Sequence, residues 1–396
     1  MHPRPLGATV REFRDRSGTG LLPIDPLLLA AAVGLVACSL VTLATATQDD
    51  SPGNPDYFVN RQAVYAGIGL VLMLAISRLD YARLRDWRVG IYAFLIASIL
   101  VVLALGSATR GSQRAIELPF FSLQTSELGK VLLVVVLAAV VVERMRDLGR
   151  RETTALVMLA ALVPALLVIA QPDLGSGLVY VSIALVTLFV AGTRWTHFAA
   201  LGALATAAVV VVLVAAPAVG VEVLEPYQMD RLTAFVNPDD DPRAQGYQQQ
   251  QSLVAVGAGG KTGRGDDATQ IKLDFLPEHH TDFVFAVVGE EFGFMGAALV
   301  LSLFALLIWR TLRILTMSKD LLGTLIAAGV LAMLMHQIFI NVGMTIGIMP
   351  ITGVTLPLMS YGGSSVIVTF IALGLLQSVY AHARETALAK GRDLAT

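Results

Sequence analysis

The chain has 396 residues, of which 55% are hydrophobic and 15% are charged. Soluble proteins carry about 25% charged residues, so the composition excludes an ordinary soluble domain and indicates a membrane protein. The formal net charge of -2 gives no reason to expect a nucleic-acid partner. The single cysteine, Cys38, excludes an intramolecular disulfide.

An arginine-rich N-terminal tail, residues 1–25, precedes the first apolar run. That run is too long for a signal peptide and shows no small-residue cleavage site, so we expect an uncleaved first span. A membrane crossing takes about 20 mostly apolar residues. Segments close to that length predict about ten transmembrane helices, near residues 27–46, 62–77, 89–106, 128–142, 154–170, 177–192, 198–219, 283–309, 321–340 and 364–380.

Positive charge is distributed unevenly between the two sides of this topology. Nineteen of the 28 Lys and Arg residues fall on the side that holds both termini. Cytoplasmic loops carry the excess of Lys and Arg, so both termini are expected in the cytoplasm. The sequence therefore predicts an all-α polytopic membrane protein with a single membrane domain over residues 26–380. A cytoplasmic C-terminal tail follows over residues 381–396, and one large external loop, about 221–282, separates spans seven and eight.

Two stretches do not fit a straight crossing. Residues 283–309 are longer than one crossing needs, and residues 349–363 contain two prolines and three glycines. Irregular backbone survives at membrane depth only where protein or a water-filled cavity covers it. We expect broken or re-entrant segments here, around a cavity that opens outward.

The external loop ends in the run Glu278-His279-His280-Thr281-Asp282, directly before span eight. Asp282 is placed either to cap the helix that follows or to act as a general base toward a hydroxyl group. Adjacent histidines on an extended chain point to opposite sides, so this run does not have the spacing of a zinc site. A divalent ion that arrives with a phosphorylated substrate is compatible with it.

Other charged residues are expected on the same external side. Lys130 lies inside span four, three residues after Glu127, a spacing that permits an ion pair on one helix face. Intramembrane charges are costly and often line functional cavities, so Lys130 is either a structural partner of Glu127 or a phosphate-binding cation. Arg110 and Arg114 are further candidates for binding phosphate. Asp173, in the turn QPDLGSG, is either a turn former or part of the same cavity.

The glycine-rich stretch GAGGKTGRG at 257–265 is superficially similar to a phosphate-binding loop. It lacks the first glycine of that motif, because Ala255 stands there. A flexible lid or a close approach of the backbone to a ligand is the better interpretation.

Five polar blocks follow one another along the chain: GSQRAIELPFFSLQTSELGK at 111–130, QPDLGSG at 171–177, RLTAFVNPDDDPRAQGYQQQQSLVAVGAGG at 231–260, KLDFLPEHHTDFVFAVVGEEFGFMG at 272–296 and NVGMTIGIMPITGVTLPLMSYGGSS at 341–365. Taken together, these blocks resemble the SEDS family (shape, elongation, division and sporulation proteins), from about residue 60 to the end of the chain. The chain departs from the usual pattern at Ala115 and Thr125, where the family has Trp and Pro.

The resemblance implies a ten-span peptidoglycan glycosyltransferase of the bacterial cytoplasmic membrane that polymerises lipid II at its external face. The residues of these blocks are most similar to those of the elongation type of the family, and the division type is the near alternative. A class B penicillin-binding protein and other membrane proteins of the elongation complex are the implied partners, with no nucleic acid. No cofactor is expected in the fold itself, although a divalent cation such as Mg²⁺ can accompany the substrate pyrophosphate.

The same resemblance implies that Asp282 is the essential catalytic residue. A rival interpretation is a transporter of lipid-linked precursors, which predicts inverted repeats and a midplane site that the sequence does not show. A third interpretation is a scaffold protein without enzymatic activity. The residues expected to contact substrate are Lys130, Glu127, Arg114, Arg110, Asp173, Arg231, His280 and Ser360.

Overall fold

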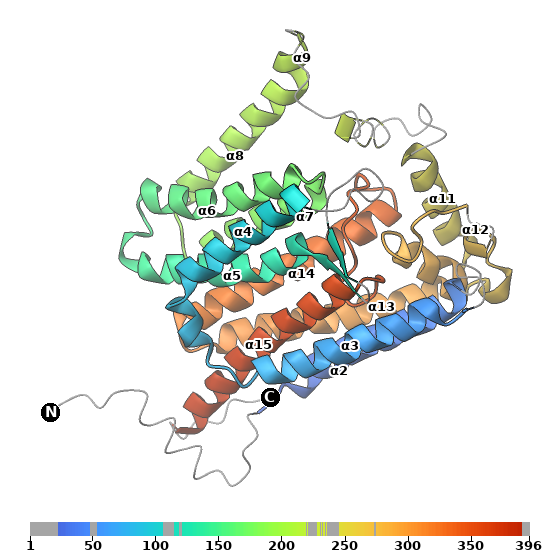
Figure 1. Ribbon diagram of the computed structural model, residues 1–396, viewed down its shortest axis with the longest axis horizontal. Helices are drawn as coiled ribbons and strands as arrows, with labels where there is room; N and C mark the ends of the chain where they lie inside the picture. The colour runs from blue at the N-terminus through green and yellow to red at the C-terminus, as the bar shows by residue number, and fades with distance from the viewer. Residues whose placement is uncertain are drawn as a thin grey trace.

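The computed structural model describes residues 23–47, 54–105, 115–118, 121–218, 245–272 and 275–389, together with residues 220, 228, 229, 231, 233 and 235. The described chain is almost entirely helical (Figure 1). Its long helices are α2 (Pro26–Ala46), α3 (Tyr57–Ile76), α4 (Arg88–Leu105), α5 (Thr125–Glu143), α6 (Arg151–Ile169), α7 (Leu174–Val190), α8 (Trp195–Val210), α13 (Val284–Met317), α14 (Leu321–Thr345) and α15 (Gly363–Ala389).

These helices agree with the predicted membrane class. In the described part of the chain, 8 helices are long and apolar enough to cross a membrane, and Arg88–Ala104 and Leu174–Val190 are shorter apolar helices. Each expected span overlaps one of them. The prediction of a helical, multi-pass membrane protein is confirmed.

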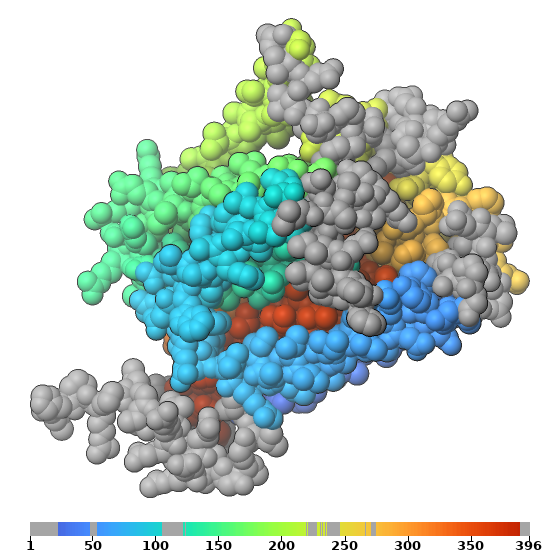
Figure 2. Space-filling view, in the orientation of Figure 1, coloured from blue at the N-terminus to red at the C-terminus, as the bar shows by residue number. Residues whose placement is uncertain are grey.

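Helices α5, α14 and α15 form the centre of the bundle, with most of their residues buried. Helix α15 packs along α3, and α14 packs against α7 and α13. Figure 2 shows the surface of α15 between α3 and α4. Leu133, Leu325 and Leu373 lie fully buried in the resulting apolar core. Closely packed helices at the centre hold the loops at either end in fixed positions.

Helix α8 leaves the bundle and continues through a π-helical turn, η3 (Val211–Ala215), into α9 (Ala216–Ala218). It projects away from the other helices (Figure 1). None of its most apolar window is buried within the protein. The start of α8 contacts α6 and α7, through Thr154 with His197 and through Phe189 with Phe198. The exposed apolar side chains along the rest of the helix can be stable in a bilayer, where lipid covers them.

Helix α13 is interrupted at Gly293, whose backbone is non-helical (φ 62°, ψ -157°). The amides that lose their helical acceptors there bond to the glycine-rich loop: Phe294 N donates to Gly260 O at 3.0 Å and Met295 N donates to Lys261 O at 3.1 Å. Buried backbone groups need such partners. The expected break in the long span is confirmed. The glycine-rich loop lies close to the backbone of α13, and its expected role as a lid or in contact with a ligand stays a prediction.

The connection from α14 to α15, residues 346–362, contains no helix. Ile351, Leu356, Leu358 and Met359 are nevertheless buried in it. Protein therefore covers the described irregular backbone, as membrane depth requires. The predicted irregular segment at 349–363 is confirmed.

The remaining elements are short. Strands β1 (Ala115–Leu118) and β2 (Phe121–Gln124) pair antiparallel, with Ala115 opposite Gln124, and β2 leads directly into α5. Helix α15 continues to Ala389, so the first part of the expected C-terminal tail is helical. The expected external loop contains helices of its own. These are α11 (Gln245–Ala258), η5 (Gly265–Asp267) and α12 (Thr269–Lys272), while η1 (Tyr81–Arg85) and η2 (Met145–Asp147) lie in other connections.

Candidate active site

Asp282 lies half-buried in a tight turn before α13. Its backbone N–H donates to Glu278 O at 3.0 Å. Glu278 adopts a positive φ of 58°, which is uncommon for a residue with a side chain. The N-cap position of α13 belongs to Phe283, and no side-chain capping bond is made there. The turn thus has a defined shape that places Asp282 just outside the helix.

The α14–α15 connection is hydrogen-bonded to the Asp282 turn. Ser360 is buried, and its hydroxyl donates to Thr281 O at 2.5 Å and accepts from Leu356 N at 2.8 Å. Tyr361 N donates to His280 O at 2.9 Å. These bonds make Ser360 a support of the turn, and its expected contact with substrate stays a prediction.

Asn341 makes a third hydrogen bond to the same turn. This buried residue of α14 donates its side-chain amide to Asp282 O at 2.8 Å and to Val354 O at 2.8 Å. One side chain therefore joins α14, the turn and the following connection. Sequence reasoning missed Asn341, which lies directly after the predicted span 321–340 but inside helix α14; an amide side chain next to an apolar span was the signal that could have found it.

Helices α2 and α3 support the connection from behind. The buried Gln62 donates to Ser360 O at 3.0 Å and accepts from Gly362 N at 3.3 Å. Ser39 donates to Met359 O at 2.7 Å. Side chains of α2 and α3 thus hydrogen-bond the backbone of the connection next to the Asp282 turn, which favours a rigid turn.

Lys130 and Glu127 form an ion pair in the first turns of α5, with Lys130 Nζ 2.6 Å from Glu127 Oε1. Both side chains are buried. The ion pair predicted from their spacing is confirmed. His336 of α14 lies near enough to Lys130 to interact with it electrostatically, and its Nε2 has no hydrogen-bond partner among the described residues. A buried charge pair beside a polar ring is typical of functional cavities in membrane proteins.

Asp173 links α7 to the start of α5. One carboxylate oxygen accepts from Ser176 N at 3.0 Å and so caps α7. The other accepts from the Ser126 hydroxyl at 2.8 Å and from the Gln124 amide at 3.2 Å. Asp173 is thus a helix cap and also fixes the segment that carries Glu127.

Residues 352–354 connect this second group of residues with the Asp282 turn. A Cβ on Gly175 would lie 2.4 Å from Val354 and 3.0 Å from Thr352 O, so the start of α7 touches this segment directly. Arg231 donates to Thr352 O at 3.2 Å. Asn341 binds Val354 O, as described above. The starts of α5, α7, α13 and α15 are thereby tied together at one end of the bundle.

The two histidines of the predicted run face different surroundings. His279 is buried, with Nδ1 3.1 Å from Leu276 O. The His280 ring centre lies 5.0 Å from that of Phe58 and 6.0 Å from that of Tyr361. Within the part of the chain that the structure describes, no group of three His, Cys, Asp or Glu residues is arranged to hold a metal ion. Arg110 and Arg114 lie outside the described residues.

Known proteins share this architecture. A family model described as FTSW_RODA_SPOVE, cell cycle protein, matches residues 21–385. The stage V sporulation protein E of Bacillus subtilis is 35% identical over 93% of this chain and 99% of its own length. The peptidoglycan glycosyltransferase MrdB of Escherichia coli is 33% identical over 91% of this chain and 94% of its own.

A solved structure supports the same relationship. A chain of a peptidoglycan synthase complex, in a study of how polymerization and crosslinking are coordinated, superposes with a TM-score of 0.77. It is 31% identical and covers 91% of this chain and 99% of its own. Agreement in sequence and in fold extends over nearly the whole chain. The protein belongs to the FtsW, RodA and SpoVE family of cell cycle proteins.

Proposed function

We propose that this membrane protein is a peptidoglycan glycosyltransferase that polymerises lipid II, with Asp282 as its general base. The observation that carries this proposal is the fixed turn around Asp282. Asn341, Ser360 and Tyr361 bind the turn through its backbone carbonyl groups. The backbone that carries the Asp282 carboxylate is therefore held in one place at the end of the bundle, which suits a base that must meet a reacting hydroxyl.

The reaction joins two lipid-linked disaccharides. A sugar hydroxyl of the acceptor attacks the anomeric carbon of the donor, and the bond from that carbon to the lipid pyrophosphate breaks. Asp282 takes the hydroxyl proton as the new glycosidic bond forms. The pyrophosphate leaves with the bonding electron pair, so negative charge builds up on the phosphate oxygens and has to be stabilised.

The helix N-termini at this end of the bundle and Lys130 are the groups that we propose to stabilise that charge. Helices α5, α7, α13 and α15 all begin at the end of the bundle that carries Asp282. Helix N-termini favour anions. Lys130 is the candidate for direct neutralisation, with Glu127 orienting it. Arg114 and Arg110 are proposed for the same task, and Arg231, His280, Asp173 and Ser360 for shaping the substrate site.

A divalent cation such as Mg²⁺ fits this scheme as a companion of the substrate. In the proposed scheme the ion arrives with the pyrophosphate and screens its charge.

The setting is part of the same proposal. We propose that the protein lies in the bacterial cytoplasmic membrane as one membrane domain over residues 26–380, with Asp282 facing outward, and the family and the charge distribution support this. A class B penicillin-binding protein is the proposed partner, with other elongation-complex proteins nearby. An elongation role is proposed first, and a division role is the alternative.

The test uses purified full-length protein and lipid II in detergent. Wild-type protein should form glycan strands, and Asp282→Asn should lose about 100-fold or more of the rate, the usual contribution of a general base. Asp267→Asn, an exposed change in the same external region, is the matched control and should remain active. Equal rates for Asp282→Asn and wild type would end the proposal.

The same assay separates the rival functions. Detergent micelles have no leaflets, so a transporter of lipid-linked precursors would produce no glycan there. A scaffold would likewise be inactive alone and would tolerate replacement of Asp282 and Lys130 in cells. Glycan formation by the purified wild-type chain excludes both.

A further inference from the structure

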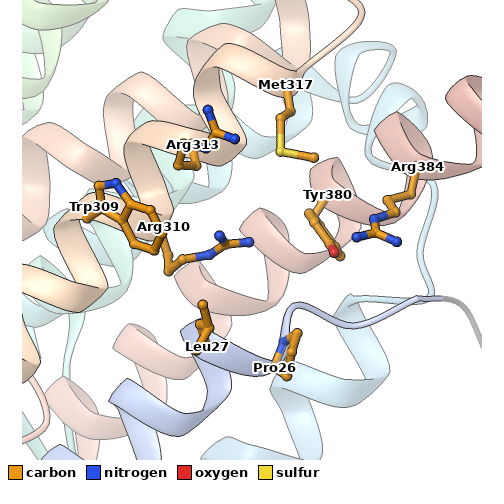
Figure 3. A pocket seen from close by; sticks show the side chains of 8 residues that line it. All are labelled: Pro26, Leu27, Trp309, Arg310, Arg313, Met317, Tyr380 and Arg384. Atoms are coloured by element: carbon orange, nitrogen blue, oxygen red, sulfur yellow. The ribbon is translucent and has the colours of Figure 1, made fainter. Parts of the chain in front are cut away.

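Three arginines gather around a groove at the end of the bundle opposite Asp282 (Figure 3). The groove lies between the start of α2, the last turns of α13 and the end of α15. Its volume of about 330 Å³ is enough for a small polar headgroup. The lining residues are Pro26, Leu27, Trp309, Arg310, Arg313, Met317, Tyr380 and Arg384.

Arg310 is already neutralised within the protein. Its Nε lies 3.0 Å from Asp25 Oδ2 and 3.2 Å from Asp25 Oδ1, and both residues are buried. Gln377 fixes Asp25 by accepting from its N–H at 2.7 Å and donating to its carbonyl oxygen at 3.1 Å. This buried cluster builds the wall of the groove and adds no net charge to it.

The other two arginines of the groove, Arg313 and Arg384, are not neutralised in the way that Arg310 is. Neither forms an ion pair with any carboxylate among the described residues. The Arg384 guanidinium lies 5.5 Å from the centre of the Tyr380 ring, and its Nε is buried without a hydrogen-bond partner in the described chain. In Figure 3 Arg310 and Arg384 extend toward each other from opposite walls of the groove, with Tyr380 between them. Two cations that have no carboxylate partner in the described chain, beside one hollow, favour an anionic ligand.

The groove also has an apolar margin. Leu27 and Trp309 are 41% and 48% exposed. Both belong to helices that are long and apolar enough to cross a membrane, so lipid is the expected neighbour of their exposed faces. An anion attached to apolar chains would satisfy both parts of the groove, whereas a free anion would use only the arginines.

We propose that this groove binds an anionic phospholipid, with Arg313 and Arg384 contacting the phosphate and with Trp309 and Leu27 beside the acyl chains. The excess of Lys and Arg places this end of the bundle at the cytoplasmic surface. Basic pockets between helices on that side suit anionic headgroups. The proposal does not depend on the glycosyltransferase activity, because the groove lies away from Asp282.

Trp309 allows a direct measurement in bilayers. The chain has 3 tryptophans, so Trp87→Phe and Trp195→Phe leave Trp309 as the only one. Brominated phosphatidylglycerol should quench its fluorescence at a lower mole fraction than brominated phosphatidylcholine does. Each arginine near a membrane surface contributes about five-fold to such a preference, so Arg313→Gln with Arg384→Gln should remove most of it.

Two matched variants in the same tryptophan background serve as controls. Arg85→Gln with Arg151→Gln removes the same charge from exposed positions outside the groove and should keep the preference. Arg313→Lys with Arg384→Lys keeps the charge and should retain a large part of it, which separates binding from misfolding.

Three results would overturn the proposal. The first is a preference for phosphatidylglycerol over phosphatidylcholine of less than two-fold in the protein that keeps Arg313 and Arg384. The second is an unchanged preference when both arginines are replaced by glutamine. The third is loss of the preference when excess inorganic phosphate is added, because the groove would then bind a free anion and not a lipid.

Discussion

The side-chain amide of Asn341 holds the backbone carbonyl of Asp282 at 2.8 Å. Its second bond, to Val354 O, connects the same turn to the segment that touches α7. Asn341 thus fixes the backbone of the residue proposed as the base.

Replacing Asn341 by Ala should slow polymerisation of lipid II about ten-fold or more, although Asp282 itself is unchanged. Two buried carbonyl groups would lose their donor, at about 1–3 kcal/mol each, and the turn would lose its fixed position. Gln377→Ala is the matched control, because Gln377 makes a similar buried bridge at the opposite end of the bundle. It should lower the melting temperature but leave the rate of correctly folded protein near the wild-type value. Similar rate losses in both variants would argue against a positioning role.

The break in α13 lies at Gly293, and we expect that no other residue is tolerated at this position. Gly293→Ala should destabilise the protein by about 1–3 kcal/mol or more, because its φ and ψ are nearly restricted to glycine. A Cβ there would also lie 2.3 Å from Gly263 N. Gly257→Ala, in helix α11 with nothing within 4 Å of the new Cβ, should be neutral or stabilising. Thermal unfolding in detergent measures both, and equal melting temperatures would contradict the account of the kink.

The buried pair in α5 allows structural and functional roles to be separated. Lys130→Met alone should cost about 3–5 kcal/mol, because it leaves the buried Glu127 carboxylate without its partner. Replacing Glu127 by Leu as well should recover most of the stability, since apolar residues can substitute for a buried ion pair. The double variant should still fail to polymerise lipid II if Lys130 neutralises pyrophosphate. A stable and active double variant would show that the pair is only structural.

Tyr81 predicts a dependence of stability on alkaline pH. Its hydroxyl donates to Asp320 Oδ2 at 2.9 Å, and burial, followed by the Asp320 charge, raises the pKa of Tyr81 well above its usual range. Below about pH 10 the hydroxyl is protonated in both the folded and unfolded states, so the full stabilisation is present. As the pH rises further, the unfolded state loses the proton while the folded state retains it, and stability falls.

Tyr81→Phe cannot lose stability in this way. Its melting temperature should be lower than that of the wild type at neutral pH, because the hydrogen bond is missing, and the difference should shrink above about pH 10. Melting curves of both proteins across that range provide the measurement. A constant difference would mean that Tyr81 does not titrate as described.

Local features of this protein were predictable from the sequence. Apolar run lengths located the helices, and the spacing of Glu127 and Lys130 gave a correct ion pair because both residues lie on one helix face. Asp173 was recognised as a turn residue, and it does cap α7. In each case the interacting groups are within a few residues of each other.

Contacts between distant segments were not predictable in the same way. Asn341 and Asp282 are 59 residues apart, and Arg310 and Asp25 are 285 apart. Which helix faces pack together decides whether such residues meet, and one sequence contains no direct signal for that choice. The support of the Asp282 turn by Gln62 and Ser39 was missed for the same reason.

The most direct test of the central claim compares binding and turnover of lipid II by Asp282→Asn. If Asp282 acts only as the base, the variant should bind lipid II with an affinity close to that of the wild type. Its single-turnover rate of glycan bond formation should fall about 100-fold or more, while Asp267→Asn stays at the wild-type rate. A wild-type rate in Asp282→Asn, or a loss explained entirely by weaker binding, would contradict the account.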